Sequence, residues 1–127
     1  KQTLVDTGIA EVVADFVRDS GISVLLIAWL VAVVIRVATG SATVATVTAA
    51  GIMAPIATDL PNGELSLLVL AVGAGSVFFS HVNDAGFWLV KEYFGLSVGQ
   101  TIKSWSIMET VLSVTGLVVV LALNLVV

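Results

Sequence analysis

The sequence predicts an all-α membrane protein, a polytopic helical bundle in which two membrane elements are discontinuous (broken) helices. Three observations carry this prediction. Hydrophobic residues make up 58% of the 127 residues and charged residues only 11%, and the mean hydropathy is +1.13. A soluble domain has about a quarter of its residues charged, so this chain lacks the polar surface that a protein needs in water. Long apolar stretches, and polar interruptions inside two of them, are the other two observations.

Charge and residue usage exclude several classes of function. The net charge is −4, so no basic face is available to neutralise the phosphates of a nucleic acid. The sequence has no cysteine and a single histidine, which argues against a disulfide framework and against a zinc site. We therefore expect no metal, no cofactor and no nucleic-acid partner. The chain begins with Lys1 and no secretory signal pattern opens it, so we expect a piece of a longer protein.

Residues 1–20 are predicted to form an amphipathic helix and not a membrane span. Apolar residues recur there at helical spacing, while acidic and basic residues occupy much of the opposite side. An acidic polar face is a poor match for anionic lipid headgroups, so contact with protein is favoured.

Residues 22–57 are predicted to form a broken helix. A continuous helix of this length would reach roughly 54 Å, whereas the hydrocarbon core of a bilayer is about 30 Å thick. The break is expected at Gly40, which leaves helical geometry cheaply, with Ser41 as the N-cap of a second half-helix. Two complete spans joined by a tight turn at Gly40 fit the length less well, because residues 43–57 reach only about 22 Å.

Residues 65–94 are predicted to form a second broken helix. The run is interrupted by the polar residues 80–84, and ionisable groups at membrane depth must face protein or water. Asp84 is expected to cap a short helix that begins at Ala85, and this helix covers about half a bilayer. The final transmembrane helix is predicted over residues 98–127, opened by a capping box at Ser97 and Gln100.

The first candidate site lies at the break in residues 22–57. The N-terminus of the second half-helix offers free N–H groups and a positive dipole end to a carboxylate, and Gly40, Ser41 and Thr43 surround it. The alternative is that these small residues only let helices pack closely. Arg36 either lends its positive charge to a bound anion or snorkels to an interface.

The second candidate site is the interruption at residues 80–84. Asp84 or His81 could take up a proton, and Asn83 offers a donor and an acceptor to substrate hydroxyls. The alternative is a structural cap at Asp84. An enzyme is not expected, because Ser80, His81 and Asp84 crowd within five residues and a catalytic triad is assembled from separate elements. Glu109 is expected to be a helix residue near the surface and not a proton relay.

Four stretches carry a resemblance to a known family. They are RVATGSATVA at residues 36–45, GAGS at 73–76, SHVNDAGFW at 80–88 and WSIMET at 105–110. In this order they resemble the C-terminal part of the gluconate permease family, and the likeness extends over essentially the whole chain. The resemblance implies a half of an ion-transporter-superfamily-like fold, with inverted repeats and discontinuous helices. It also implies that residues 40–43 and Asn83–Asp84 contribute to the substrate region.

The resemblance implies a proton-coupled symporter for gluconate or a related sugar acid in the bacterial inner membrane. Its expected partners are the organic acid, protons, the lipid bilayer and the remainder of the permease chain, and a homo-oligomer is left open. Two alternatives remain: a symporter of another small organic anion or D-serine, and a helical membrane module that does not transport.

Overall fold

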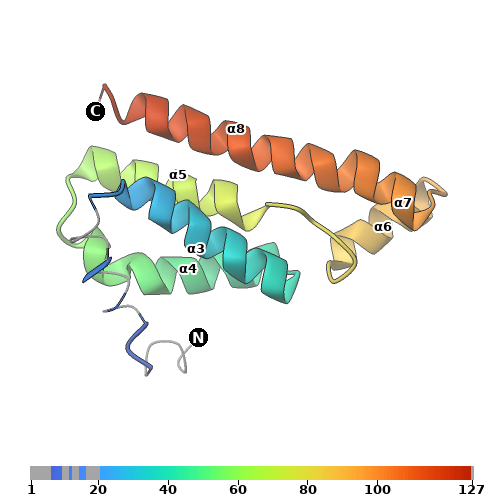
Figure 1. Ribbon diagram of the computed structural model, residues 1–127, viewed down its shortest axis with the longest axis horizontal. Coiled ribbons are helices and arrows are strands. Elements are labelled where there is room, and N and C mark those ends of the chain that lie inside the picture. The colour runs from blue at the N-terminus through green and yellow to red at the C-terminus, as the bar shows by residue number, and fades with distance from the viewer. Residues whose placement is uncertain (1–6, 10–11, 13–14, 17–20, 127) are drawn as a thin grey trace.

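The computed structural model describes residues 7–9, 12, 15–16 and 21–126, and the regular elements within them are helices (Figure 1). Most of the predicted amphipathic helix at residues 1–20 lies outside the described residues. The elements are α3 (Val24–Thr39), α4 (Ala42–Ala57), α5 (Asn62–Ser76), α6 (Ala85–Tyr93), α7 (Val98–Thr101), the π-helical turn η1 (Ile102–Ser106) and α8 (Ile107–Leu123).

The predicted break in residues 22–57 is found at Gly40 and Ser41. Gly40 adopts a left-handed conformation with φ of 72°, and its N–H donates to the carbonyl of Arg36 at 2.8 Å. Ser41 is the N-cap of α4, where its Oγ accepts a hydrogen bond from the Val44 N–H at 3.3 Å. These local expectations are confirmed, because each depends on residues within one turn of the break.

The chain reverses direction at this break, so α3 and α4 lie side by side as an antiparallel hairpin (Figure 1). A tight turn is the arrangement that the length argument had disfavoured. That argument required each arm to cross the whole bilayer. Each arm has 16 residues, which is about 24 Å of helix and less than a typical hydrocarbon core.

The second predicted interruption is also present. Helix α5 ends at Ser76, an irregular segment occupies residues 77–84, and α6 begins at Ala85. Asp84 is the N-cap of α6, and its Oδ1 accepts a hydrogen bond from the Gly86 N–H at 2.9 Å, as expected. The irregular segment is longer than the polar residues alone indicated.

Helices α7, η1 and α8 form one continuous helix over Val98–Leu123. Within the part of the chain that the structure describes, this is the one helix long and apolar enough to cross a membrane. Its start has the predicted capping box, in which Ser97 Oγ accepts from the Gln100 N–H and the Gln100 side chain accepts from the Ser97 N–H. The π-helical turn near its start was not predicted.

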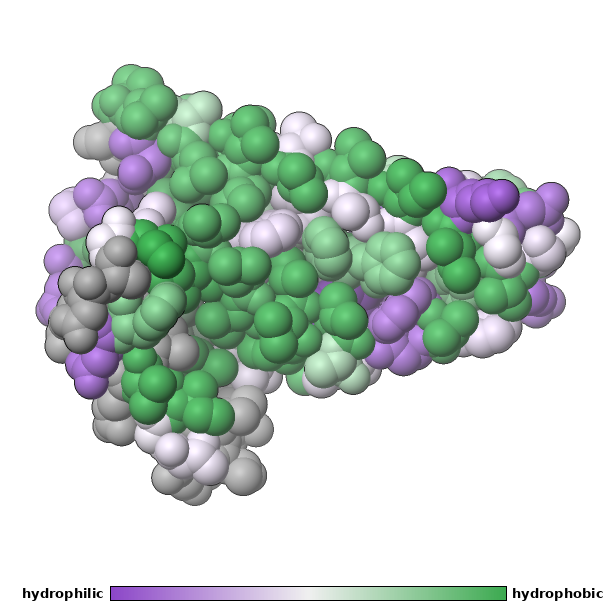
Figure 2. Space-filling model, in the orientation of Figure 1, coloured by the Kyte–Doolittle hydropathy of each residue, from purple (hydrophilic) through white to green (hydrophobic). Residues whose placement is uncertain are grey.

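The core lies where α3 packs between α4 and α5, with α8 covering α5 (Figure 1). It is built largely of small and aliphatic side chains, which let the helices approach closely. Buried members of the main cluster include Leu25, Ala28, Ala49, Met53, Leu68 and Val120. Figure 2 shows that hydrophobic side chains also cover most of the face in view, with hydrophilic ones gathered mainly toward its ends. Such a surface requires lipid or further protein around it.

Gly75 lies at a close contact between α3 and α5. A Cβ atom at Gly75 would lie 2.5 Å from the Trp29 carbonyl oxygen and 2.8 Å from the Cβ of Ala32. Gly73, two residues earlier on the same helix, has nothing within 4 Å of its Cβ position. Alanine at either position raises helix propensity, but only alanine at Gly75 would clash with α3. A comparison of the two substitutions therefore separates packing from helix propensity.

We predict that Gly75→Ala lowers the thermal unfolding midpoint of the full-length permease that carries this segment, measured in detergent micelles. The free energy of unfolding should fall by about 1–3 kcal/mol, the usual range for overpacking. Gly73→Ala should leave the midpoint unchanged or raise it, because alanine is the better helix former. Equal midpoints for the two variants would contradict the observed crossing of α3 and α5.

Candidate functional site

The two sites predicted from sequence form one site in the structure. The turn between α3 and α4 lies directly against the irregular segment that precedes α6. Asn83 Nδ2 donates a hydrogen bond to the Val37 carbonyl at 2.9 Å, and a Cβ atom at Gly40 would lie 2.2 Å from the Asn83 carbonyl oxygen. Only glycine allows this approach, so Gly40 serves both the turn and the contact.

Arg36 and Asp84 form an ion pair across this contact. Arg36 Nη2 lies 2.6 Å from Asp84 Oδ2, and Nη1 donates to the Gly40 carbonyl at 2.5 Å. The side chain of Arg36 is 4% exposed and that of Asp84 is 16% exposed. The snorkelling alternative for Arg36 is therefore wrong, because its charge is neutralised inside the protein. Removal of one partner of a buried pair destabilises a protein by about 3–5 kcal/mol.

The carboxylate of Asp84 is held by donors from three directions. Oδ2 accepts hydrogen bonds from Arg36 and from the Ser80 hydroxyl, and Oδ1 accepts from the Gly86 N–H. A carboxylate can accept about four hydrogen bonds, so most of this capacity is used. Asp84 is thus a helix cap and an ion-pair partner at the same time. The expected structural cap is confirmed, and proton uptake by Asp84 stays a prediction.

Ser80 connects the pair to the long helix Val98–Leu123. Trp105 Nε1 donates to Ser80 Oγ at 2.8 Å, and the Ser106 hydroxyl donates to the Ser80 carbonyl. Both donors belong to the π-helical turn η1, and π-helical turns are frequent at functional sites. Neither Ser80 nor Trp105 was predicted as a site residue. The available signal was the place of Ser80 at the start of the polar interruption at residues 80–84.

A polar hollow of about 380 Å³ opens where the turn and the segment meet. Its lining includes six of the seven residues predicted from sequence: Arg36, Gly40, Ser41, Thr43, Asn83 and Asp84. Thr39, Ala42 and Ala85 complete it. Among the buried side-chain atoms of the described residues, Nε of Arg36 has no hydrogen-bond acceptor. A buried donor without an acceptor is costly, so the guanidinium has one hydrogen-bonding capacity that its protein partners leave unused.

His81 is the predicted site residue that does not line the hollow. Its ring lies against Phe79, with 5.6 Å between the ring centroids. Phe79 has φ of 42°, an uncommon conformation for a residue other than glycine. Its strained backbone marks the place where the chain turns from α5 toward Ser80.

Glu109 is half-buried and was expected near the surface. It lies inside the helix Val98–Leu123, three residues after Ser106 and four before Ser113, and both of these serines are fully buried. This spacing puts Glu109 on the helix face that meets the rest of the bundle. Its carboxylate is within electrostatic range of Arg36 and Asp84.

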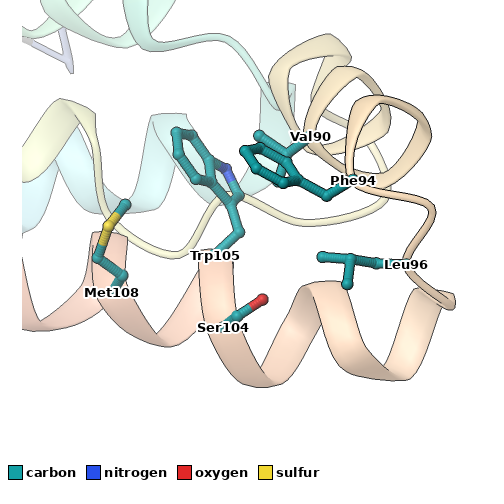
Figure 3. Close-up of a pocket in the computed structure, with 6 residues that line it drawn as sticks. All are labelled: Val90, Phe94, Leu96, Ser104, Trp105 and Met108. Atoms are coloured by element: carbon teal, nitrogen blue, oxygen red, sulfur yellow. The ribbon is translucent and has the colours of Figure 1, made fainter.

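A second hollow, of about 340 Å³, lies between α6 and the long helix (Figure 3). Val90, Phe94, Leu96, Ser104, Trp105 and Met108 line it. The lining contains no charged side chain, so this hollow offers nothing to a sugar acid. Trp105 lines this apolar hollow with its ring and donates its Nε1–H to Ser80. It therefore connects the apolar hollow to the Arg36–Asp84 site.

Comparison with known proteins identifies the family. A family model described as GntP family permease matches residues 1–126. The chain belongs to the GntP permease family. GntP permeases are membrane proteins, in agreement with the hydropathy of the chain and with the membrane-length helix Val98–Leu123.

Several curated relatives are similar throughout the chain. A gluconate permease of Pseudomonas aeruginosa is 58% identical over 126 residues, which is 99% of this chain and 28% of that protein. A high-affinity gluconate transporter of Escherichia coli is 58% identical over 128 residues, which is 100% of this chain and 29% of that protein. A Gnt-II system L-idonate transporter of Escherichia coli is 49% identical over 98% of this chain and 28% of that protein.

The GntP segment described here thus spans less than a third of the length of the relatives it matches. These relatives are named as permeases and transporters, which confirms the expectation that the chain is not an enzyme. No solved structure matches the chain.

We predict that Gly40→Ala disrupts the site more than the same change at Gly95. Both glycines have a positive φ, 72° and 62°, so alanine is strained at each. Only at Gly40 would the added Cβ meet another segment, since nothing lies within 4 Å at Gly95. Thermal unfolding in micelles should show the larger drop for Gly40→Ala. A drop of equal size at Gly95 would mean that backbone strain alone, and not contact with Asn83, requires glycine at position 40.

Proposed function

We propose that this chain is part of a multi-pass permease that takes up gluconate or a related sugar acid, together with protons, across the bacterial inner membrane. The observation that carries the proposal is the polar hollow, which has a buried cation and a helix N-terminus in a chain otherwise covered with apolar side chains. Family membership and the names of the relatives, gluconate permease and gluconate transporter, support the same substrate.

The carboxylate of the substrate would bind between Arg36 and the start of α4. The first N–H groups of a helix have no partner inside the helix, and together they carry a partial positive charge. Ser41 and Thr43 line the hollow at this helix start, and their hydroxyls can donate to a carboxylate or a sugar hydroxyl. Transporters use interrupted helices in this way near the middle of the membrane.

The hydroxyl groups of the substrate would contact Asn83 and Thr39. Asn83 already donates one amide hydrogen to Val37, and its amide oxygen remains as an acceptor. Thr39 was not predicted from sequence, but it lines the hollow beside Gly40. A lining with both donors and acceptors suits a polyhydroxy acid better than an apolar anion.

The proton would be carried by Asp84 or by His81, as the sequence analysis proposed. The position of Asp84 beside Arg36 and in the hollow supports Asp84, because a proton there changes the charge next to the substrate. His81 lies outside the hollow, so its protonation would act on the substrate less directly. A broken-helix fold of the ion-transporter type and a homo-oligomeric assembly remain part of this proposal.

A related anion is the alternative substrate, and one relative is named as an L-idonate transporter. Gluconate and L-idonate share the carboxylate and the chain of hydroxyls, so the same side chains would serve both. A membrane module that does not transport would have no use for a buried cation at an open polar hollow. Uptake assays distinguish a gluconate permease from a permease for another anion and from a membrane module that does not transport.

We predict that the full-length permease in proteoliposomes takes up labelled gluconate when an inward proton gradient is applied. Arg36→Gln should reduce uptake at least about a hundredfold, because the substrate then loses a charge-assisted contact of about 3 kcal/mol. Glu92→Gln is the matched control, since Glu92 is exposed on α6, away from the hollow, and forms an ion pair with its neighbour Lys91. Its uptake should be unchanged.

Competition with unlabelled L-idonate and with D-serine in the same vesicles identifies the substrate class. Displacement by sugar acids alone supports the proposal as stated. Wild-type vesicles that take up no sugar acid would sink the substrate assignment and leave the membrane fold standing.

A further inference from the structure

We propose that Arg36 is exchanged between two carboxylates: it pairs with Asp84 when the site is empty and with the substrate carboxylate when the site is loaded. A proton on Asp84 is what releases Arg36 to the substrate. This inference rests on the proposed function and deepens it, because it assigns the coupling of proton and substrate to a single guanidinium group.

The contacts of the guanidinium are the first step. Nη1 is fixed by the Gly40 carbonyl, and Nη2 binds one oxygen of Asp84, while Nε has no acceptor among the described residues. Nε and Nη2 lie on the same edge of the guanidinium. Together they form a fork that can donate two parallel hydrogen bonds to the two oxygens of one carboxylate. Asp84 therefore uses half of that fork. A carboxylate that took both donors would be bound better than Asp84 is.

The second step is that Asp84 cannot use the whole fork in this arrangement. Its other oxygen, Oδ1, is held by the Gly86 N–H at the start of α6. A free ligand in the hollow has no such restraint. Because Arg36 and Asp84 both line the hollow, a carboxylate bound there lies beside the ion pair, and the edge of the guanidinium that Asp84 covers becomes free when Asp84 releases it.

The third step is to count the ionisable groups around Asp84. The ionisable groups that face Asp84 are Arg36 from α3, Glu109 from α8 and, on its own segment, His81 with its ring against Phe79. Helices α4 and α5 bring no charged group to this end, and the charges of α6, Lys91 and Glu92, pair with each other. The substrate would bring a third carboxylate beside those of Asp84 and Glu109, which with all three ionised leaves one cation among three anions. A proton on Asp84 removes one of these anions as the substrate adds one, so the charge of the site stays constant.

The fourth step is a place for the proton. When Asp84 is protonated on Oδ2, this O–H can donate a hydrogen bond to Ser80 Oγ. The Ser80 oxygen has two lone pairs, and among the described residues only one of them accepts a hydrogen bond, from Trp105 Nε1. The Ser80 hydroxyl then turns away from Asp84. The neutral carboxyl keeps Oδ1 as the acceptor for Gly86, so the cap of α6 survives protonation.

The test is equilibrium binding of labelled gluconate to the full-length permease between about pH 5 and about pH 8, where an ordinary carboxyl group is ionised and must take up a proton to become neutral. Wild-type affinity should fall at least about tenfold as the pH rises. Asp84→Asn, which mimics the neutral carboxyl, should bind with one affinity throughout, at least as high as that of the wild type at the low end of this range. In vesicles this variant should exchange gluconate but fail to accumulate it. Glu92→Gln should behave as the wild type.

A pH dependence that persists unchanged in Asp84→Asn would overturn the exchange while leaving the proposed function intact. Absence of gluconate binding by the wild type at every pH would overturn the proposed function itself, and the exchange with it.

Because Asp84→Asn leaves Arg36 without its counter-charge, the variant could fail to fold, and a wild-type measurement covers that outcome. Calorimetric titration with gluconate in buffers of different ionisation enthalpy counts the protons bound with each substrate. Close to one proton is expected at neutral pH, both for the wild type and for His81→Gln. No proton uptake by the wild type, or its loss in His81→Gln, would overturn the assignment to Asp84.

Discussion

The ion pair between Arg36 and Asp84 is the interaction on which the candidate site at the polar hollow depends. It joins two irregular segments, the α3–α4 turn and the stretch before α6, that are separated by 48 positions in sequence. Both segments expose backbone polar groups in an apolar environment, where unpaired groups are costly. The pair, the Asn83 contact with Val37 and the Ser80 contacts with Trp105 and Ser106 supply those partners.

Apolar packing elsewhere in the bundle makes this polar end possible. Helices α3, α4 and α5 approach closely through small residues such as Ala28, Ala32 and Gly75, and van der Waals contact is the main attraction between helices in lipid. Because close packing fixes the helices, their ends are fixed too. The guanidinium of Arg36 is thereby held where Asp84 and the start of α4 meet it. A looser bundle would let water into the pair and weaken it.

Features that depend on neighbours in sequence were predictable, and features that depend on distant segments were not. The break at Gly40, the Ser41 and Asp84 caps and the Ser97–Gln100 capping box each follow from a few adjacent residues. The reversal of the chain at Gly40 did not follow, because residue spacing fixes where a helix stops and not where the next one points. The ion pair was missed for the same reason. Arg36 and Asp84 were each recognised, but no local pattern pairs them.

Asp84 connects the chemistry of the hollow to the position of a helix. One of its oxygens holds Arg36 and Ser80, and the other caps α6, whose N-terminus favours negative charge. Neutralisation of Asp84 therefore weakens the electrostatic stabilisation of the α6 start and removes the attraction that holds this start against α3. The Ser80 contacts reach from the same carboxylate to η1, so the long helix Val98–Leu123 is joined to the same group. A charge change at this one carboxylate would thus act on three helices at once: α3, α6 and the long helix.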